Sequence, residues 1–176
     1  MKFIIFAVLT GLIGSVLAKP DQIKSQSPDG QLIAVFQRDS DRELYRLTLS
    51  TRDGKVRFQS NPIDATISQS IVWNATGDSM AFSAGTPFLM ETFILFSQKG
   101  DYLLEKVPSP EYGWDNFYQI PRKWTNTLLT LELDGPHAGK AIQHYYKGTM
   151  VIDTSEKLKV VSENINTVEQ GAAANP

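Results

Sequence analysis

The sequence predicts an all-β fold made of successive antiparallel meanders, and three observations support this prediction. Turn-forming groups that contain glycine recur along the chain at similar distances. The segments between them are short and rich in β-branched and aromatic residues, and several alternate apolar with polar side chains, as strands do. Apolar residues at helical spacing are almost absent, so we expect no helix in the folded part.

The N-terminal segment is typical of a secretory signal peptide. Lys2 provides a positive charge, residues 3–13 form an apolar run, and Val16 and Ala18 are small residues just before the bond to Lys19. The apolar run is too short to span a bilayer comfortably. We therefore expect cleavage after Ala18 and a secreted or periplasmic protein with no integral membrane segment. The alternative is an uncleaved N-terminal anchor.

The mature chain is expected to hold one domain. Residues 1–18 form the signal peptide, residues 19–163 the domain, and residues 164–176 a disordered tail. After cleavage, 16 basic and 19 acidic residues remain, so the net charge is −3, and the two signs are interspersed. Because nucleic-acid binding needs a basic stripe, no nucleic-acid partner is expected. With no cysteine, the chain has no disulfide, thiolate metal site or cysteine nucleophile.

The first repeat begins at the turn of residues 27–30, Ser-Pro-Asp-Gly. It is followed by β-rich runs at 32–36 and 44–49, a hairpin turn at Asp53-Gly54, and a return strand at 55–59. Glycine suits such a turn because the central residues of a tight hairpin need positive φ. The predicted order is therefore turn, strand, strand, hairpin turn, strand.

The same order then repeats. Its second copy has a turn at residues 76–78, a hairpin turn at Lys99-Gly100, and strands at 71–73, 79–83, 92–97 and 101–107. Gly30 and Gly77 are 47 residues apart, and Gly54 and Gly100 are 46 apart. This period is close to the ~40–45 residues of a four-stranded propeller blade. A weaker third copy starts at Trp124, 51 residues after Trp73, with strands at 128–133, 141–146, 149–153 and 158–162.

Two of these copies carry a family resemblance. Residues 27–35 read SPDGQLIAV and are followed by a Leu-Tyr strand and by Asp53-Gly54-Lys55, a pattern that resembles a WD40-like β-propeller repeat of the TolB type. Residues 73–83 read WNATGDSMAFS and are similar to the same consensus. The resemblance covers about two repeats well and a third poorly. It implies blades that pack on one another through aromatic and small apolar residues.

Three blades are too few for a closed propeller, which typically needs at least ~4. An open array would leave two apolar faces in water. We therefore expect about three propeller-like blades that pair into a six-bladed homodimer, or hide their end faces behind atypical outer repeats. The alternative fold is a β-sandwich.

Catalytic and metal-binding patterns are weak. His137 lies beside Asp134 in a glycine-proline loop, which reads as a solvated hairpin tip because no third ligand is suggested. His144 reads as a strand residue. Asp39, Asp41 and Glu43 alternate as in a calcium loop but lack its glycine bend and distal glutamate. The sequence therefore predicts no catalytic residue, no metal site and no cofactor, and an enzyme is disfavoured.

The candidate binding residues lie in an aromatic connector, residues 108–118 with Pro121 shortly after, which joins the second and third copies. It concentrates four rings, those of Tyr112, Trp114, Phe117 and Tyr118, among prolines and a glycine. Loops held by a rigid scaffold often carry recognition, and tyrosine and tryptophan offer flat apolar faces with polar tips. The alternative is that these rings fill the space between two units as core.

The predicted function is therefore a non-catalytic binding or assembly module outside the cytoplasm. It would recognise a protein, peptide or glycan through its rim loops and the aromatic connector. The alternative is a small secreted hydrolase or enzyme inhibitor whose polar site forms only in the fold.

Overall fold

The computed structural model describes residues 21–39, 44–64, 66–86, 89–110, 117–136, 144–155 and 157–169, and all regular secondary structure in these ranges is β-strand. The all-β class is therefore confirmed. In chain order the strands are β1 (Gln22–Gln26), β2 (Leu32–Arg38), β3 (Leu44–Thr51), β4 (Val56–Gln59), β5 (Ile63–Asp64), β6 (Thr66–Trp73), β7 (Ser79–Gly85), β8 (Met90–Gln98), β9 (Asp101–Lys106), β10 (Tyr118–Thr125), β11 (Leu128–Pro136), β12 (His144–Asp153) and β13 (Lys159–Glu169).

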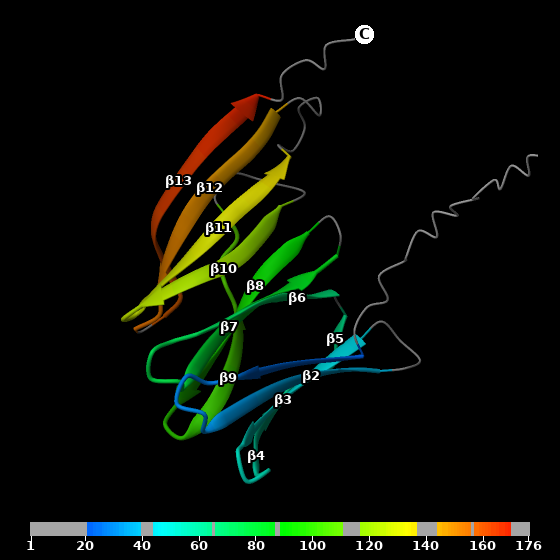
Figure 1. Ribbon diagram of the computed structural model, residues 1–176. Helices are drawn as coiled ribbons and strands as arrows, with labels where there is room; N and C mark the ends of the chain where they lie inside the picture. The colour runs from blue at the N-terminus through cyan, green and yellow to red at the C-terminus, as the bar shows by residue number, and fades with distance from the viewer. Residues whose placement is uncertain are drawn as a thin grey trace, which may run out of the picture.

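The strands form three antiparallel meanders, as predicted (Figure 1). Meander 1 is β1–β4, with the short β5 paired to the start of β3. Meander 2 is β6–β9, and meander 3 is β10–β13. Within the described residues, no strand pairing closes the meanders into a ring or a barrel. In each meander the chain runs from one strand directly to its neighbour.

The predicted hairpin turns fall at matching places in the first two meanders. Gly54 lies between β3 and β4 with φ 89°, and Gly100 lies between β8 and β9 with φ 91°. The turns before the second strands also match, since Gly30 and Gly77 have φ of 72° and 76°. In both turns the glycine N–H donates to a carbonyl three residues earlier. The repeat deduced from glycine spacing is therefore a repeat in backbone geometry.

Four details of the predicted strands need correction. β1, β5 and β10 were missed, and Tyr118, the last residue of the predicted connector, begins β10. The two strands predicted at 141–146 and 149–153 are one strand, β12, from residue 144. The tail was predicted to begin at residue 164, but β13 continues to Glu169 because it pairs with β12 over that length. Residues 170–176 lie outside the described part of the chain.

Meander 2 lies between the other two, because its two faces belong to two different hydrophobic clusters. Met80, Phe82 and Leu95 pack with meander 1 in a cluster that includes Phe36, Leu47 and Leu49. Ala81 and Ile94 pack with meander 3 in a cluster that includes Leu129, Leu131, Met150 and Ile152. Neighbouring residues of β7 thus point to opposite faces, as the period of a strand requires.

Meanders 2 and 3 are joined at one strand pair. Tyr118 of β10 pairs in parallel with Met90 of β8, and the Met90 N–H donates to the Phe117 carbonyl at 2.8 Å. Beyond this pair the two strands separate, and β10 crosses against β6 and β7. This crossing allows meander 3 to cover the second face of meander 2.

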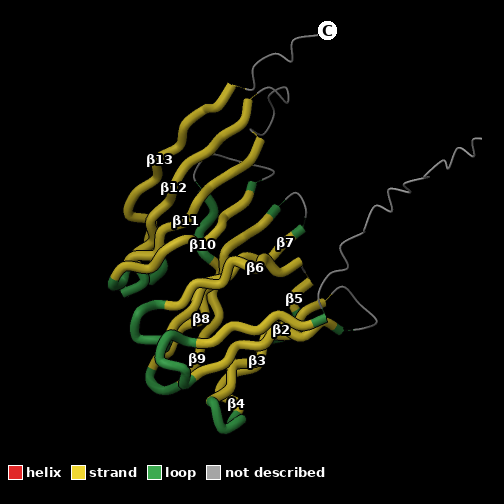
Figure 2. The backbone as a smooth tube through the Cα atoms, in the orientation of Figure 1, coloured by secondary structure: helices red, strands yellow, loops and turns green. Residues whose placement is uncertain are grey.

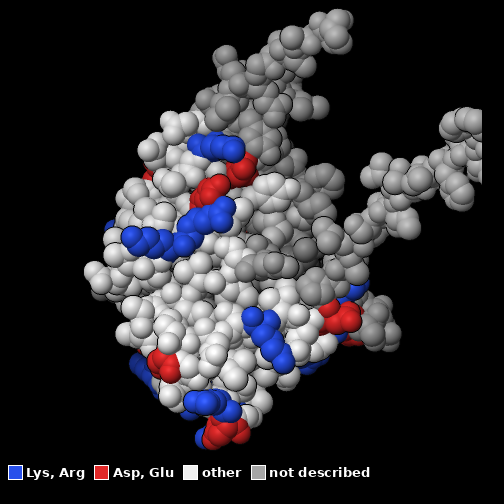
Figure 3. Space-filling model, in the orientation of Figure 1, with Lys and Arg blue, Asp and Glu red and all other residues white. Residues whose placement is uncertain are grey.

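The outer faces of the stack are polar. On meander 1 the side chains that alternate with buried residues are mostly amides, hydroxyls and charges, with Ile33 and Val35 between them. They are Gln22, Lys24, Gln26, Gln37, Arg46, Thr48, Ser50 and Gln59. On meander 3 the corresponding set is Lys123, Thr130, Glu132, Asp134, Lys147, Thr149, Ser162, Asn164 and Asn166. Figure 3 shows basic and acidic groups interspersed over the surface. The expectation of atypical outer repeats agrees with these polar faces.

The connections between strands lie at two opposite ends of the stack. The turns within strand pairs β1–β2, β3–β4, β6–β7, β8–β9, β10–β11 and β12–β13 lie at the lower left and bottom of Figure 2, and we call this the turn end. Two contacts support this grouping: a Cβ on Gly77 would lie 3.0 Å from Asp29 Oδ1, and Arg57 Nη2 donates to the Gly100 carbonyl at 3.4 Å. The opposite end, where Gly85, Met90 and Tyr118 lie, is called the loop end.

Four aspartates stabilise the turns by accepting hydrogen bonds within them, and their pKa values lie below 3.8. Asp29 accepts from the Ser27 hydroxyl and the Gln31 N–H, and Asp53 from the Thr51 hydroxyl and the Lys55 N–H. The pKa of Asp153 is lowered by the N–H and hydroxyl of Ser155. Partial burial raises the pKa of Asp78, but hydrogen bonds from Asn74, Thr76 and Ser79 together lower it.

The lowered pKa values of these four aspartates predict that the protein becomes less stable in acid. A carboxyl whose folded pKa is depressed contributes above its unfolded value of 3.8 and loses that contribution as pH falls through the folded pKa. We expect the melting temperature to be steady above about pH 5 and to drop below pH 3.8. Replacing all four aspartates with asparagine should flatten this drop. Asp21→Asn, at an exposed carboxyl before β1, is the control, and an equal flattening by it would contradict the assignment.

Candidate binding surface at the loop end

The base of the aromatic connector is held by Gln119, a fully buried residue of β10. Its side-chain Nε2 donates to the Pro108 carbonyl at 2.9 Å, and its Oε1 accepts from the Thr92 N–H at 3.1 Å. One side chain therefore ties the start of the connector to β8 and to the strand that follows the connector. Since Thr92 also accepts the Val107 N–H at 2.8 Å, the first residues of the connector are fixed to meander 2.

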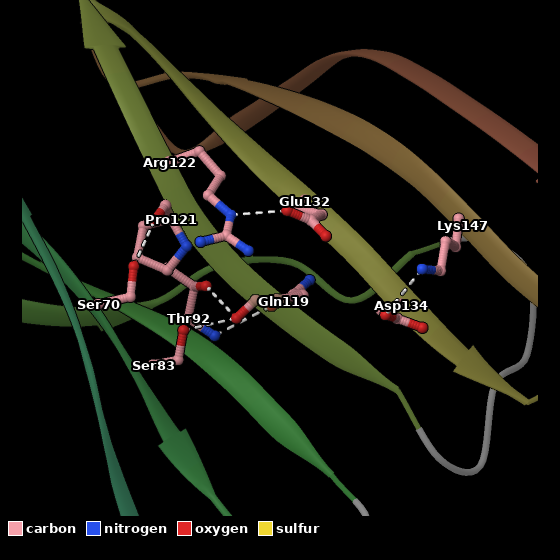
Figure 4. Close-up of polar contacts among 9 residues, drawn as sticks. All are labelled: Ser70, Ser83, Thr92, Gln119, Pro121, Arg122, Glu132, Asp134 and Lys147. Carbon is pink, nitrogen blue, oxygen red and sulfur yellow. Dashed lines mark hydrogen bonds and ion pairs between the residues drawn. The ribbon is translucent and has the colours of Figure 1, made fainter.

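The backbone of β10 is fixed to meander 2 by hydroxyl groups. Ser83 and Thr92 donate to the Gln119 carbonyl at 2.6 and 3.0 Å, and Ser70 donates to the Pro121 carbonyl at 2.7 Å (Figure 4). These donors come from β7, β8 and β6 in turn. Ser83 and Thr92 are fully buried, so these bonds are shielded from water. The result is a polar seam between two hydrophobic clusters.

The four predicted binding residues fall into three positions. Phe117 is 4% exposed and packs in the second hydrophobic cluster, so its ring anchors the connector in the core. Tyr118 is half-buried and begins β10 at the loop end. Tyr112 and Trp114 lie outside the described residues. The structure thus describes both ends of the connector, residues 108–110 and 117–118, and shows that both are attached to the same strands.

Tyr118 belongs to a cross-strand row on the outer face of meander 3. The row continues through Asp134 and Lys147 to Asn166 on successive strands. Lys147 Nζ lies 4.0 Å from Asp134 Oδ2, and in the next row Arg122 Nε donates to Glu132 Oε2 at 2.6 Å (Figure 4). The two basic side chains are more than half exposed, so both pairs contribute little to stability. They balance the charge of the face beside the connector, so this surface is polar but carries no strong field of one sign.

The weaker sequence candidates are only partly described. His137, Asp41 and Glu43 lie outside the described residues, and the structure describes the strand position of His144 but not its side chain. Asp134 is placed on β11, and Asp39 directly follows β2. Within the described part of the chain, no three histidine, aspartate or glutamate side chains are grouped as a metal site. Among the same residues, no helix is long and apolar enough to cross a membrane.

Sequence reasoning missed Gln119 and its hydroxyl partners. A lone glutamine between Tyr118 and Ile120 gives no signal, because glutamine is mostly a surface residue. Its partners come from 11 to 36 positions away along the chain, so only the fold brings them together. The aromatic residues beside it were detectable because four rings in eleven residues are unusual.

The fold and the site define this protein as a stack of three antiparallel β-meanders with an anchored aromatic connector at one end. Comparison with known proteins finds no family model that matches the chain and no curated relative of similar sequence.

Proposed function

We propose that this chain is a non-catalytic binding or assembly module that works in the periplasm or after secretion and recognises a protein, peptide or glycan. The observation that carries the proposal is the anchoring of the connector. Gln119 and the Met90–Phe117 bond hold both of its ends against buried strands, so residues 111–116 join two fixed points. Preorganisation of this kind reduces the entropy cost of binding.

The proposal also covers family and assembly. We propose that the meanders are blades of the TolB type. The matching glycine turns of meanders 1 and 2 support this assignment. A homodimer would have to use a surface other than the outer faces, since pairing these would remove charged and amide groups from water. The contacting set in the connector is Tyr112 and Trp114 with Tyr118 beside them, and Phe117 is their attachment to the core.

The test replaces Tyr112 and Trp114 together with alanine. We expect capture of the partner from the native envelope or secretome to be lost while the melting temperature changes by less than about 2 °C. A buried Trp→Ala change alone would cost ~3–5 kcal/mol and lower the melting temperature by ~6–20 °C. Mass spectrometry of the exported protein in the same preparation should place its N-terminus at Lys19.

The control for this experiment is Leu128→Ala, which shortens a 39% exposed leucine at the turn end. It should leave both capture and melting temperature unchanged. A large fall in melting temperature with unchanged capture in the double variant would show that Tyr112 and Trp114 are core residues, and the binding proposal would then fail.

A further inference from the structure

A groove of about 350 Å³ lies between the outer edges of meanders 1 and 2. One wall is the chain from Phe58 to Ile63, and the other is residues 102–104 of β9. Phe58, Ile63, Tyr102 and Leu104 are half-buried and pack against the first hydrophobic cluster, so these parts of the walls are apolar, whereas residues 59–61 add polar side chains. Leu103 is 39% exposed and its side chain alternates to the other face of β9, so a strand added to this edge would also meet an apolar side chain on that face. The groove uses none of the residues of the aromatic connector, which begins four residues after Leu104.

The β9 wall is a free sheet edge. Among the described residues β9 pairs with β8 alone, in six consecutive pairs without a bulge, and it contains no proline. In an antiparallel pair about half of the residues of an edge strand point their N–H and C=O groups away from the neighbour. Such an edge is a template for another extended chain. The opposite wall is unsuited to this, because Pro62 has no N–H and interrupts it.

The turn-end side of the groove has a guanidinium group. Arg57 Nη2 donates to the Gly100 carbonyl at 3.4 Å, next to the start of β9. Burial raises the pKa of Tyr102, the Arg57 charge lowers it, and the charges of Asp78 and Asp29 raise it, so Arg57 and two turn carboxylates lie near this wall of the groove. Within the described residues Arg57 makes no ion pair, and a single long hydrogen bond leaves most of its five donors for a ligand. The preferred partner of such a fork is a carboxylate.

We propose that this groove binds an extended peptide segment of a partner protein, which adds as a strand to the free edge of β9. A large apolar side chain of that segment lies between Phe58 and Tyr102, and a carboxylate at its end near the turn pairs with Arg57. The backbone bonds give affinity for any extended chain, while the apolar groove and the guanidinium give selectivity. This site is separate from the connector surface, so either can fail without the other.

The probe is a set of fluorescein-labelled nine-residue peptides in which threonine alternates with leucine or phenylalanine and one end carries glutamate. Fluorescence polarisation with the purified protein should give dissociation constants of about 10–100 μM. Changing the glutamate to glutamine should weaken binding by about tenfold, as expected for losing a charged hydrogen-bonded pair. Methylating the backbone nitrogens should abolish binding, because the strand can then no longer donate to β9.

Two variants of the protein locate the site. Arg57→Gln should weaken the glutamate peptide to the level of the glutamine peptide and leave the glutamine peptide unchanged. Leu103→Lys should weaken both, whereas Leu128→Lys, at an equally exposed leucine on β11, should weaken neither. The Tyr112 and Trp114 double variant should bind these peptides normally. The proposal is overturned if no peptide binds at about 1 mM, or if Leu103→Lys and Leu128→Lys act alike.

Discussion

Replacing Phe82 with alanine is expected to lower the free energy of unfolding by about 3–5 kcal/mol. Phe82 is fully buried on β7 and faces meander 1. Its ring meets Phe36 edge-on with centroids 4.7 Å apart, and it stacks on Phe93 at 5.8 Å. Alanine would remove both aromatic contacts and leave a cavity between two sheets. A loss of this size corresponds to a fall in melting temperature of about 6–20 °C.

The measurement is urea unfolding followed by tryptophan fluorescence, since Trp73 packs against the same cluster. Phe58→Ala is the matched control, because this ring is half-exposed at the edge of the cluster, and it should cost less than half as much. Equal losses for the two variants would mean that the contact between meanders 1 and 2 does not depend on the Phe82 ring.

Replacing Gln119 with leucine is expected to cost about 2–4 kcal/mol. The change keeps a similar volume but leaves the Thr92 N–H and the Pro108 carbonyl without their partner. The unsatisfied Thr92 N–H is buried and costs about 1–3 kcal/mol, and loss of the part-buried bond to Pro108 adds about 1 kcal/mol. The hydrogen bonds that Ser83 and Thr92 donate to the backbone carbonyl of residue 119 do not involve the glutamine side chain, so they should persist.

Hydrogen exchange tests this prediction at a single backbone amide, that of Thr92. The Thr92 amide should lose its protection by much more than the overall loss of stability explains, because its acceptor is the Gln119 side chain. Gln59→Leu is the control, since Gln59 is exposed and has a 3.5 Å contact with Thr48. It should change stability by less than about 0.5 kcal/mol. Unchanged protection at Thr92 in the Gln119 variant would contradict the anchoring role.

How much could be predicted from the sequence depended on whether the signal was local. Gly30, Gly54, Gly77 and Gly100 all have positive φ, so their turns and the strands beside them were predicted from spacing alone. Strands without such a signal were missed. β1 is mostly polar because it is an edge strand with one face in water, and β10 contains Pro121, which argues against a strand.

The sites show the same limit. The aromatic connector was visible because its rings are close in sequence, whereas its anchor, Gln119, depends on partners from three other strands. The groove joins Phe58 to Tyr102, which are 44 positions apart, and no pattern in either segment indicates the other. Phe117 was predicted to be a binding residue because it lies in the aromatic connector, but its ring is buried because it packs in the cluster formed with meander 3.

The polar outer faces fix how this array can grow over evolution. Within the part of the chain that the structure describes, meander 2 alone is apolar on both sides, with Phe82 on one face and Ala81 on the other. A duplicated copy of meander 1 or meander 3 would have to pack its hydrophilic side against a hydrophobic neighbour. Tandem duplication could therefore lengthen the array only through copies of meander 2. These copies would lie between meanders 1 and 3, which would remain at the two ends.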